Sequence, residues 1–256
     1  MNIFIYDSFL NQGKFSGTVS RIETRITDLG LNGKINRQAL GKNIKESVIN
    51  EIKRGAKTII AVGNDETFNS VIEAAMNTKI PVGLIPINHG SNQIASILGI
   101  PFREKACDIL AARRIETIDV GLVNNQHTFI ISANITTKNS IVEINKNYSI
   151  ETEIPGQIKI INIATNKKEL PKNFSFSPQD GFLELMIEAE QKNKLFKKSL
   201  FSQSIFSLKS LSLFNSGGHL LELDCIKKIA SPYEINIMPR AINIIVGKDR
   251  SFNFSA

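Results

Sequence analysis

The 256-residue sequence lacks the features that define several classes of protein. It has only two cysteines, Cys107 and Cys225, and no Cys-x-x-Cys spacing, which argues against a disulfide scaffold and against a structural zinc site. No apolar run approaches the roughly 20 residues that a membrane-spanning helix needs. The first seven residues are too short an apolar stretch for a signal peptide and lack its charged flank. We therefore expect a cytoplasmic protein whose chain opens with a β-strand.

The composition is that of an ordinary globular protein with a basic surplus. Hydrophobic residues make up 42% and charged residues 21%, and the length allows one large core or two smaller ones. The 31 Lys and Arg residues exceed the 24 Asp and Glu residues, which gives a net charge of +7. This charge favours anionic partners, such as a nucleotide or an anionic membrane surface. Nucleic acid is not expected as a partner, and a homodimer is left open.

Strands and helices alternate in the first half of the sequence. Apolar runs predict strands at 2–6, 32–35, 58–62 and 81–86. Helical spacing of apolar residues predicts helices at 16–29, 44–54, 67–76, 94–98 and 104–114. This alternation implies a parallel, doubly wound (Rossmann-like) sheet with helices on both faces.

From about residue 117, short β-branched runs separated by Asn, Gly, Pro and Lys replace this pattern. The runs lie at 128–135, 140–144, 157–163, 182–188, 207–213 and 234–238. They are typical of an antiparallel β-sandwich. We expect an α/β domain over residues 1–118 and a sandwich over residues 119–256, with a return of the last strands to the first domain left open.

Polar residues follow the most apolar strand, at the point where the next helix starts. They are Asn64, Asp65 and Glu66, after a buried strand that ends at Gly63. This edge is where open α/β sheets bind ligands, because the amides and dipole of the helix start favour phosphate. A carboxylate there suits a cation or a hydroxyl, so metal-bridged nucleotide is the candidate. Gly-Asn-Asp is also a good turn sequence, and a loop without function stays open.

The stretch Gly63–Val71 resembles the signature of the diacylglycerol-kinase-type lipid kinases. That signature is Gly-Gly-Asp-Gly-Thr, two residues, then Glu-Val, and Gly63, Asp65, Thr67 and Val71 match it. The family belongs to the NAD kinase/diacylglycerol kinase-like superfamily. The resemblance implies an ATP-binding α/β domain followed by a β-sandwich.

A second stretch, Pro86–Pro101, resembles the family's Pro-x-Gly-Thr-x-Asn-Asp loop and its closing Leu-Gly-Ile-Pro. Asn92 matches, while Asn88 and His89 stand where Gly and Thr would. Two matching loops in the right order are more specific than either alone. For His89 we expect a polar loop residue, with nucleotide binding or a catalytic role as alternatives. Ser8 lies where the family places a third loop near the nucleotide phosphates.

A third resemblance concerns Ser177–Leu185, which is similar to the family's Pro, polar residue, Asp-Gly-x-Leu. The family's Asp helps to hold a structural magnesium, which implies a metal-ligand role for Asp180. A type I turn that needs no metal is an equal alternative. Nearby, residues 192–201 mix lysines with Leu and Phe, which suits contact with an anionic leaflet at the inner membrane face or, alternatively, a solvated loop.

The catalytic base of the family is missing. In the resembling kinases it is the Asp of an Asp-Gly-Glu triplet, and the sequence has no such triplet. Asp224 is the only carboxylate where the triplet should fall. There is also no Gly-x-x-x-x-Gly-Lys and no His-Arg-Asp, so no other phosphotransfer motif replaces it. Glu66, beside Asp65, either helps to chelate Mg²⁺ or blocks the nucleotide; both readings stay open.

The resemblance implies an ATP- and Mg²⁺-dependent lipid kinase that transfers the γ-phosphoryl group to a lipid hydroxyl. A pseudokinase that binds nucleotide or membrane, and an NAD kinase-like phosphotransferase, are the alternatives. The expected metal ligands are Asp65 and Asp180. The expected nucleotide-binding residues are Ser8, Gly63, Asn64, Asp65, Glu66, Thr67, Asn69, Asn88 and Asn92.

Overall fold

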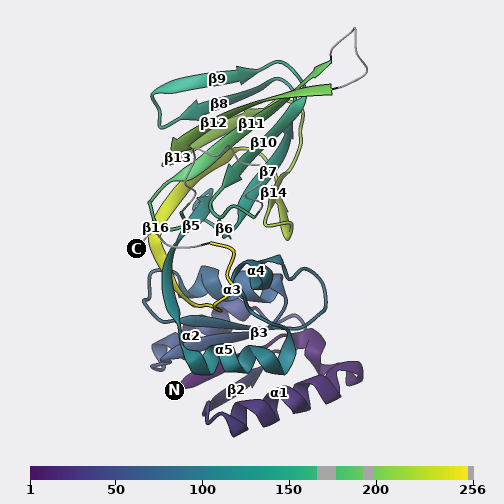
Figure 1. The fold of residues 1–256 in the computed structure, drawn as a ribbon, viewed down its shortest axis with the longest axis vertical. Helices are drawn as coiled ribbons and strands as arrows, with labels where there is room; N and C mark the ends of the chain where they lie inside the picture. Colours follow the sequence, from purple (N-terminus) through teal and green to yellow (C-terminus); the bar gives the residue numbers. More distant parts are fainter. Residues whose placement is uncertain (166–176, 193–198, 253–256) are drawn as a thin grey trace. The chain divides into compact units, whose positions relative to one another are not determined.

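The structure is a computed structural model that describes residues 1–165, 177–192 and 199–252. The chain forms two compact units (Figure 1). The first is Met1–Ile118 together with the segment that begins at Arg240, and the second is Asp119–Pro239. The predicted fold class, a parallel α/β region followed by an antiparallel region, is confirmed.

The first unit contains a parallel sheet in the strand order β2-β1-β3-β4. The end of β16 lies beside β4, also parallel, where Ile244 pairs with Val82. The strands are β1 (Asn2–Tyr6), β2 (Gly33–Arg37), β3 (Thr58–Gly63), β4 (Val82–Pro86) and β16 (Tyr233–Ile245). Every residue of β3 and β4 is buried, because helices cover both faces of the sheet.

Helices α2 and α3 pack together on one face of this sheet, and α1 and α5 pack together on the other (Figure 1). The α-helices are α1 (Ser16–Asp28), α2 (Ile44–Lys53), α3 (Asp65–Ala75), α4 (Gln93–Ile97) and α5 (Ala106–Ala112). Short 3-10 helices are η1 (Ser8–Asn11), η2 (Gly13–Phe15) and η3 (Arg103–Lys105). Helix α3 begins two residues earlier than the predicted Thr67, because Asn64 caps it.

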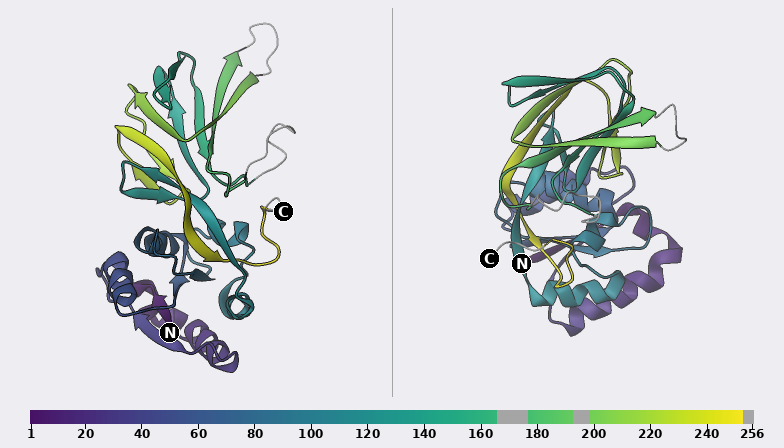
Figure 2. Two further views of the ribbon diagram at one scale, coloured as in Figure 1. Left: turned by 90° about the vertical axis from the view of Figure 1, so that its left-hand side faces the viewer. Right: turned by 45° about the horizontal axis from the view of Figure 1, so that its top comes forward.

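The second unit is a sandwich of antiparallel strands, seen from two further sides in Figure 2. One sheet has the order β12-β11-β10-β7-β14-β15, and the other contains β16-β13-β8-β9 with β5 and β6. The strands are β5 (Ile115–Val123), β6 (His127–Phe129), β7 (Ser132–Thr137), β8 (Ser140–Ile144), β9 (Tyr148–Thr152), β10 (Gly156–Ile161), β11 (Leu183–Lys192), β12 (Ser199–Leu208), β13 (Ser210–Asn215), β14 (Leu221–Leu223) and β15 (Lys227–Ile229). Inward-facing residues of both sheets, among them Phe129, Leu185 and Leu213, form one apolar core.

Two predicted strands are interrupted in the structure, and a third continues past its predicted end. The predicted strand 128–135 is interrupted, because the amides of residues 130–132 bond to the Asp224 carboxylate instead of to a neighbouring strand. The predicted strand 207–213 breaks at Lys209, where Asn145 accepts the backbone amides of Lys209 and Ser210. The strand at 234–238 continues through Pro239 into β16, with Arg240 at a φ of 50°.

One prediction concerns residues whose side chains the structure does not describe. Residues 192–201, the basic and aromatic segment, lie outside the residues whose side chains the structure describes. Across the described residues, no helix combines the length and apolarity that a membrane crossing demands.

Candidate functional site

Gly63, Asn64 and Thr67 form one structural unit at the start of α3. The Asn64 Oδ1 accepts the Thr67 amide at 3.1 Å, and the Asn64 amide donates to the Thr67 hydroxyl at 3.2 Å. This is a capping box, which satisfies amides that a helix start leaves without partners. A Cβ added to Gly63 would lie 2.2 Å from Thr67 Oγ1. Glycine is therefore required at position 63, because the Thr67 side chain fills the space.

Asp7 connects this unit to the loop after β1. The Thr67 hydroxyl donates to Asp7 Oδ2 at 2.7 Å. Asp7 Oδ1 accepts the Phe9 amide at 3.2 Å and the Ser8 hydroxyl at 3.3 Å. Asp7 was absent from the predicted site residues. The signal that could have identified it is its position directly after β1, since β1 and β3 are neighbouring parallel strands whose loops leave the same edge.

Asp65 connects α3 to the second motif loop. Its side chain is 0% exposed. Its Oδ2 accepts the Ser91 hydroxyl at 2.7 Å, the Gln93 amide at 2.6 Å and the Ile94 amide at 3.3 Å. Burial raises the pKa of the Asp65 carboxyl, and the Ser91 and amide hydrogen bonds oppose that rise. The two motif loops recognised in the sequence are thus joined through one carboxylate oxygen.

Two acceptor oxygens in these loops remain unsatisfied. Asp65 Oδ1 and Asn92 Oδ1 are buried, and neither has a hydrogen-bond partner among the described residues. The Asn92 amide group donates to the Gly90 carbonyl at 3.1 Å, so its carbonyl oxygen is the free end. A buried polar atom without a partner costs about 1–3 kcal/mol. These oxygens therefore favour a hydrogen-bond donor or a cation.

His89 packs against aromatic rings of the loop that follows β1. Its ring centroid lies 4.7 Å from that of Phe9 and 5.5 Å from that of Phe15. The two phenylalanine rings are 5.3 Å apart. Apolar packing therefore holds the second motif loop beside the loop that follows β1.

The predicted nucleotide residues lie at the end of β3, in the loops that follow β1, β3 and β4, and in the first two turns of α3. The register pairs Tyr6 with Val62 and Gly63 with Pro86, so the three loops leave the sheet at one edge. Gly63, Asn64, Asp65, Thr67 and Asn69 are buried, Ser8 and Asn92 are half-buried, and Glu66 and Asn88 are exposed.

Asp180 forms a turn in the second unit. Its exposed side chain accepts the Phe182 amide at 2.9 Å, and Gly181 adopts a φ of 76°. The Gly181 amide donates to the buried Asp119 at 2.8 Å. In the part of the chain that the structure describes, no three His, Cys, Asp or Glu side chains are placed to hold a metal. The metal role of Asp180 stays a prediction.

Glu184 lies close to this turn and is 3% exposed. Burial, with a smaller contribution from the Asp180 charge, raises the pKa of Glu184 to about 8. This side chain was not among the predicted site residues.

Asp224, the carboxylate at the expected position of the missing base, is occupied by backbone amides. Its Oδ2 accepts the Ile130 amide at 2.7 Å, and its Oδ1 accepts those of Ile131 at 2.8 Å and Ser132 at 2.9 Å. The side chain is 2% exposed, in the turn between β14 and β15. Asp224 therefore ties this turn to the β6–β7 connection.

The first unit is a doubly wound parallel sheet with polar βα loops at the edge where such sheets bind ligands, and an antiparallel sandwich follows it. Residues 2–123 match the family model of the diacylglycerol kinase catalytic domain. This match confirms the resemblance recognised from the loop motifs.

Solved structures share the fold of both units. A diacylglycerol kinase of Bacillus anthracis strain Sterne matches with a TM-score of 0.74 and 16% identity, covering 97% of each chain. A putative diacylglycerol kinase of that strain matches with a TM-score of 0.76 and 14% identity, covering 96% of this chain and 97% of the other. At such identities the likeness concerns the fold alone.

One curated relative also matches part of the sequence. The uncharacterized protein sll0036 of Synechocystis sp. is 32% identical over 109 residues, which are 41% of this chain. The chain spans about a quarter of the length of this relative, since the match covers 25% of it.

Proposed function

We propose that the protein is an ATP- and Mg²⁺-dependent lipid kinase that transfers the γ-phosphoryl group to a lipid hydroxyl. The observation that carries the proposal is the pair of buried acceptors, Asp65 Oδ1 and Asn92 Oδ1, which have no partner among the described residues. Both lie within residues 2–123, which match the family model of the diacylglycerol kinase catalytic domain, in loops whose sequences resemble that family's nucleotide loops. A magnesium-bound nucleotide would provide a cation and hydrogen-bond donors to such oxygens.

The donor set suits magnesium. Mg²⁺ prefers hard oxygen ligands and keeps several waters, so one or two carboxylates plus substrate phosphates are its usual partners. Asp65 Oδ1 is a carboxylate oxygen of this kind, and it would hold the ion. Mg²⁺ supplies neutralisation of the charge on the phosphates.

The chain's own residues mainly position the nucleotide in this proposal. Asn64 and Thr67 fix the start of α3, and Thr67 also holds Asp7 and its loop. Asp65 Oδ2 sets the position of the second loop. Phosphoryl transfer depends largely on positioning and electrostatic stabilisation, so these contacts serve the reaction directly. Ser8, Asn69, Asn88 and Asn92 complete the proposed nucleotide loops.

The acceptor is proposed from the family match, and no base is assigned to deprotonate it. A lipid acceptor requires a membrane surface, and the net charge of +7 favours an anionic leaflet. We therefore place the protein in the cytoplasm with peripheral contact to the inner membrane face. The state of Asp224 favours a second candidate, a pseudokinase that binds nucleotide without transferring phosphate, because both carboxylate oxygens already accept amides.

Calorimetric titration of ATP into the full chain, with Mg²⁺ or with EDTA, tests the nucleotide site. We expect micromolar binding with Mg²⁺ and at least about tenfold weaker binding in EDTA. Transfer of phosphate from ATP to diacylglycerol in mixed micelles, and to NAD in parallel, then separates the activities. Binding without transfer supports the pseudokinase, transfer to NAD alone overturns the lipid acceptor, and no binding at millimolar ATP contradicts both kinase readings.

A further inference from the structure

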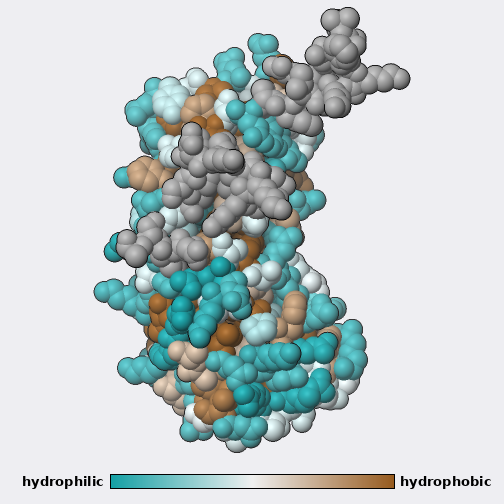
Figure 3. Space-filling view, viewed as in Figure 1, coloured by the Kyte–Doolittle hydropathy of each residue, from teal (hydrophilic) through white to brown (hydrophobic). Residues whose placement is uncertain are grey.

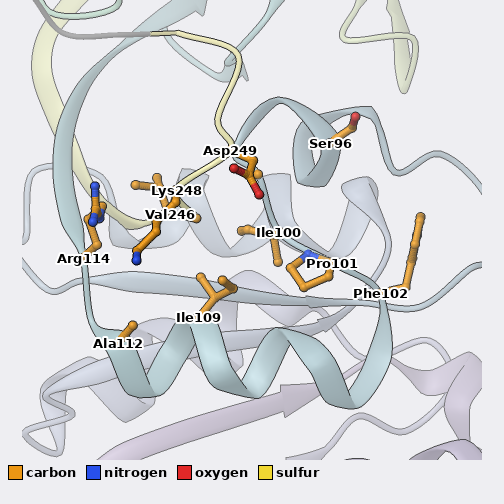
Figure 4. Close-up of a pocket in the computed structure, with 12 residues that line it drawn as sticks. Ser96, Ile100, Pro101, Phe102, Ile109, Ala112, Arg114, Val246, Lys248 and Asp249 are labelled. Atoms are coloured by element: carbon orange, nitrogen blue, oxygen red, sulfur yellow. The ribbon is translucent and has the colours of Figure 1, made fainter.

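A pocket of about 570 Å³ lies in the first unit and contains none of the predicted nucleotide residues (Figure 4). It is bounded by the connection after α4, by α5, and by the segment Val246–Asp249. Its volume lies within the range of roughly 300–1,000 Å³ that is typical of small-molecule sites. The pocket is therefore large enough for a ligand of its own.

The wall formed by Val246–Asp249 is fixed by backbone contacts. The Val246 amide donates to the Arg114 carbonyl at 2.9 Å, and the Gly247 amide donates to the Leu98 carbonyl at 2.8 Å. A Cβ on Gly247 would lie 1.8 Å from the Gly99 carbonyl oxygen, so the two segments cross at glycines. The backbone contacts and this close crossing fix the position of the pocket wall formed by Val246–Asp249.

The pocket is apolar with a cationic end. Figure 4 places Arg114 and Lys248 at one end, Phe102 at the other, and Ile100 and Ile109 between them. In the described residues neither Arg114 nor Lys248 forms an ion pair. On the face drawn in Figure 3, apolar side chains are visible between hydrophilic ones over the region of α5.

One anion also lines this pocket. The Asp249 carboxylate lies over Ile100, apart from the two cations (Figure 4). It leaves the Arg114 end positively charged, and the pocket offers few polar groups that could recognise a nucleobase.

We propose that this pocket binds a single-chain anionic amphiphile. Arg114 and Lys248 receive its carboxylate or phosphate head, and the alkyl chain lies over Ile100, Ile109 and Phe102. Charge complementarity at one end and apolar area along the rest carry the assignment. The site stands apart from the proposed function, because none of the proposed nucleotide-binding residues lines it.

Calorimetry with octyl phosphate and octanoate, below their micelle concentrations, tests the site on the full chain. We expect both to bind, and dodecanoate to bind more tightly than octanoate. Octanol, octylammonium and inorganic phosphate should each bind at least about tenfold more weakly, because each lacks the anionic head or the chain. Inorganic phosphate as strong as octyl phosphate would mean a plain anion site, and octylammonium as strong as octanoate would mean an unselective apolar pocket; either overturns the proposal.

Variants of the residues that line the pocket, with one matched control outside it, test where octyl phosphate binds. Arg114→Gln/Lys248→Gln should weaken octyl phosphate about tenfold or more. The matched double variant Lys53→Gln/Lys57→Gln removes the same charge from exposed positions outside the pocket and should leave binding unchanged. Ala112→Trp fills the pocket and should abolish octyl phosphate binding while retaining the circular dichroism spectrum and the response to Mg²⁺ and ATP. Wild-type octyl phosphate affinity in Ala112→Trp, or equal losses in the two double variants, would contradict the assignment.

Discussion

Asp65 and Asp224 are both buried carboxylates at the ends of short connections, and they use their oxygens differently. Asp224 distributes three backbone amides over both oxygens. Asp65 receives three donors on one oxygen and leaves the other without a partner among the described residues. A carboxylate that is satisfied by its own chain serves the fold. One with a buried open oxygen retains the capacity to bind a cation or a donor.

The two carboxylates should differ most in what their loss costs the folded state. Asp224→Asn should lower the free energy of unfolding by about 3 kcal/mol, because either orientation of the amide sets an NH₂ against a backbone N–H. Asp65→Asn should cost less than about 1 kcal/mol, since its oxygen can keep all three donors. Urea unfolding followed by circular dichroism measures both. Equal decreases in the free energy of unfolding would mean that both carboxylates contribute equally to the stability of the fold.

The second prediction concerns the frame that holds Asp65. Gly63→Ala should destabilise the first unit by about 2 kcal/mol, because the added Cβ collides with the Thr67 side chain and disrupts the capping box. The matched control is Gly13→Ala, where nothing lies within 4 Å of the new Cβ. We expect the control to change the unfolding free energy by less than about 0.5 kcal/mol. A similar value for both variants would exclude Thr67 as the cause.

A third buried carboxylate, Glu184, should make the free energy of unfolding depend on pH. Its pKa is raised from 4.5 to about 8, so the folded state holds the proton more tightly than the unfolded state does. Its contribution to stability is therefore fully present below pH 4.5 and is lost as the pH rises to about 8. In this window the unfolding free energy of wild type relative to Glu184→Gln should fall by about 1.4 kcal/mol per pH unit.

Unfolding in EDTA between about pH 5 and pH 8, within the window that the raised pKa defines, measures this slope without divalent cations. Glu234→Gln, at an exposed position, is the control and should follow the wild-type pH dependence. If Glu184→Gln and wild type keep a constant difference over the window, the glutamate is ionised in the folded state.

The smallest expected effect is that of Glu66, the neighbour of Asp65, on nucleotide affinity. Glu66 is exposed, and as a second carboxylate beside Asp65 it should repel the phosphates. Glu66→Gln is expected to raise the affinity for ATP with Mg²⁺ about twofold, the size of a screened surface interaction. Weaker binding in this variant, by calorimetry, would instead make Glu66 a part of the magnesium site.

The sequence predicts the strands and the two motif loops because apolar periodicity and turn residues are local signals. It does not predict which atoms meet. The Asp65 bonds reach residues 26 to 29 positions away, and Asp7 meets Thr67 only because β1 and β3 pair in parallel. The predicted strand 128–135 was wrong for the same reason, since the carboxylate that interrupts it lies more than 90 residues further along the chain. Local sequence patterns do not indicate contacts between residues so far apart in the chain.

Calorimetric titration of ATP with Mg²⁺ into wild type, Asp65→Asn and Asp28→Asn tests whether the Asp65 carboxylate binds the magnesium-bound nucleotide. Asp28 is an exposed carboxylate at the end of α1 and controls for the change in charge. We predict at least about tenfold weaker binding for Asp65→Asn, with unfolding free energy close to that of wild type, and unchanged binding for Asp28→Asn. Wild-type affinity in a folded Asp65→Asn variant would contradict the claim that the open oxygen of Asp65 holds the magnesium-bound nucleotide.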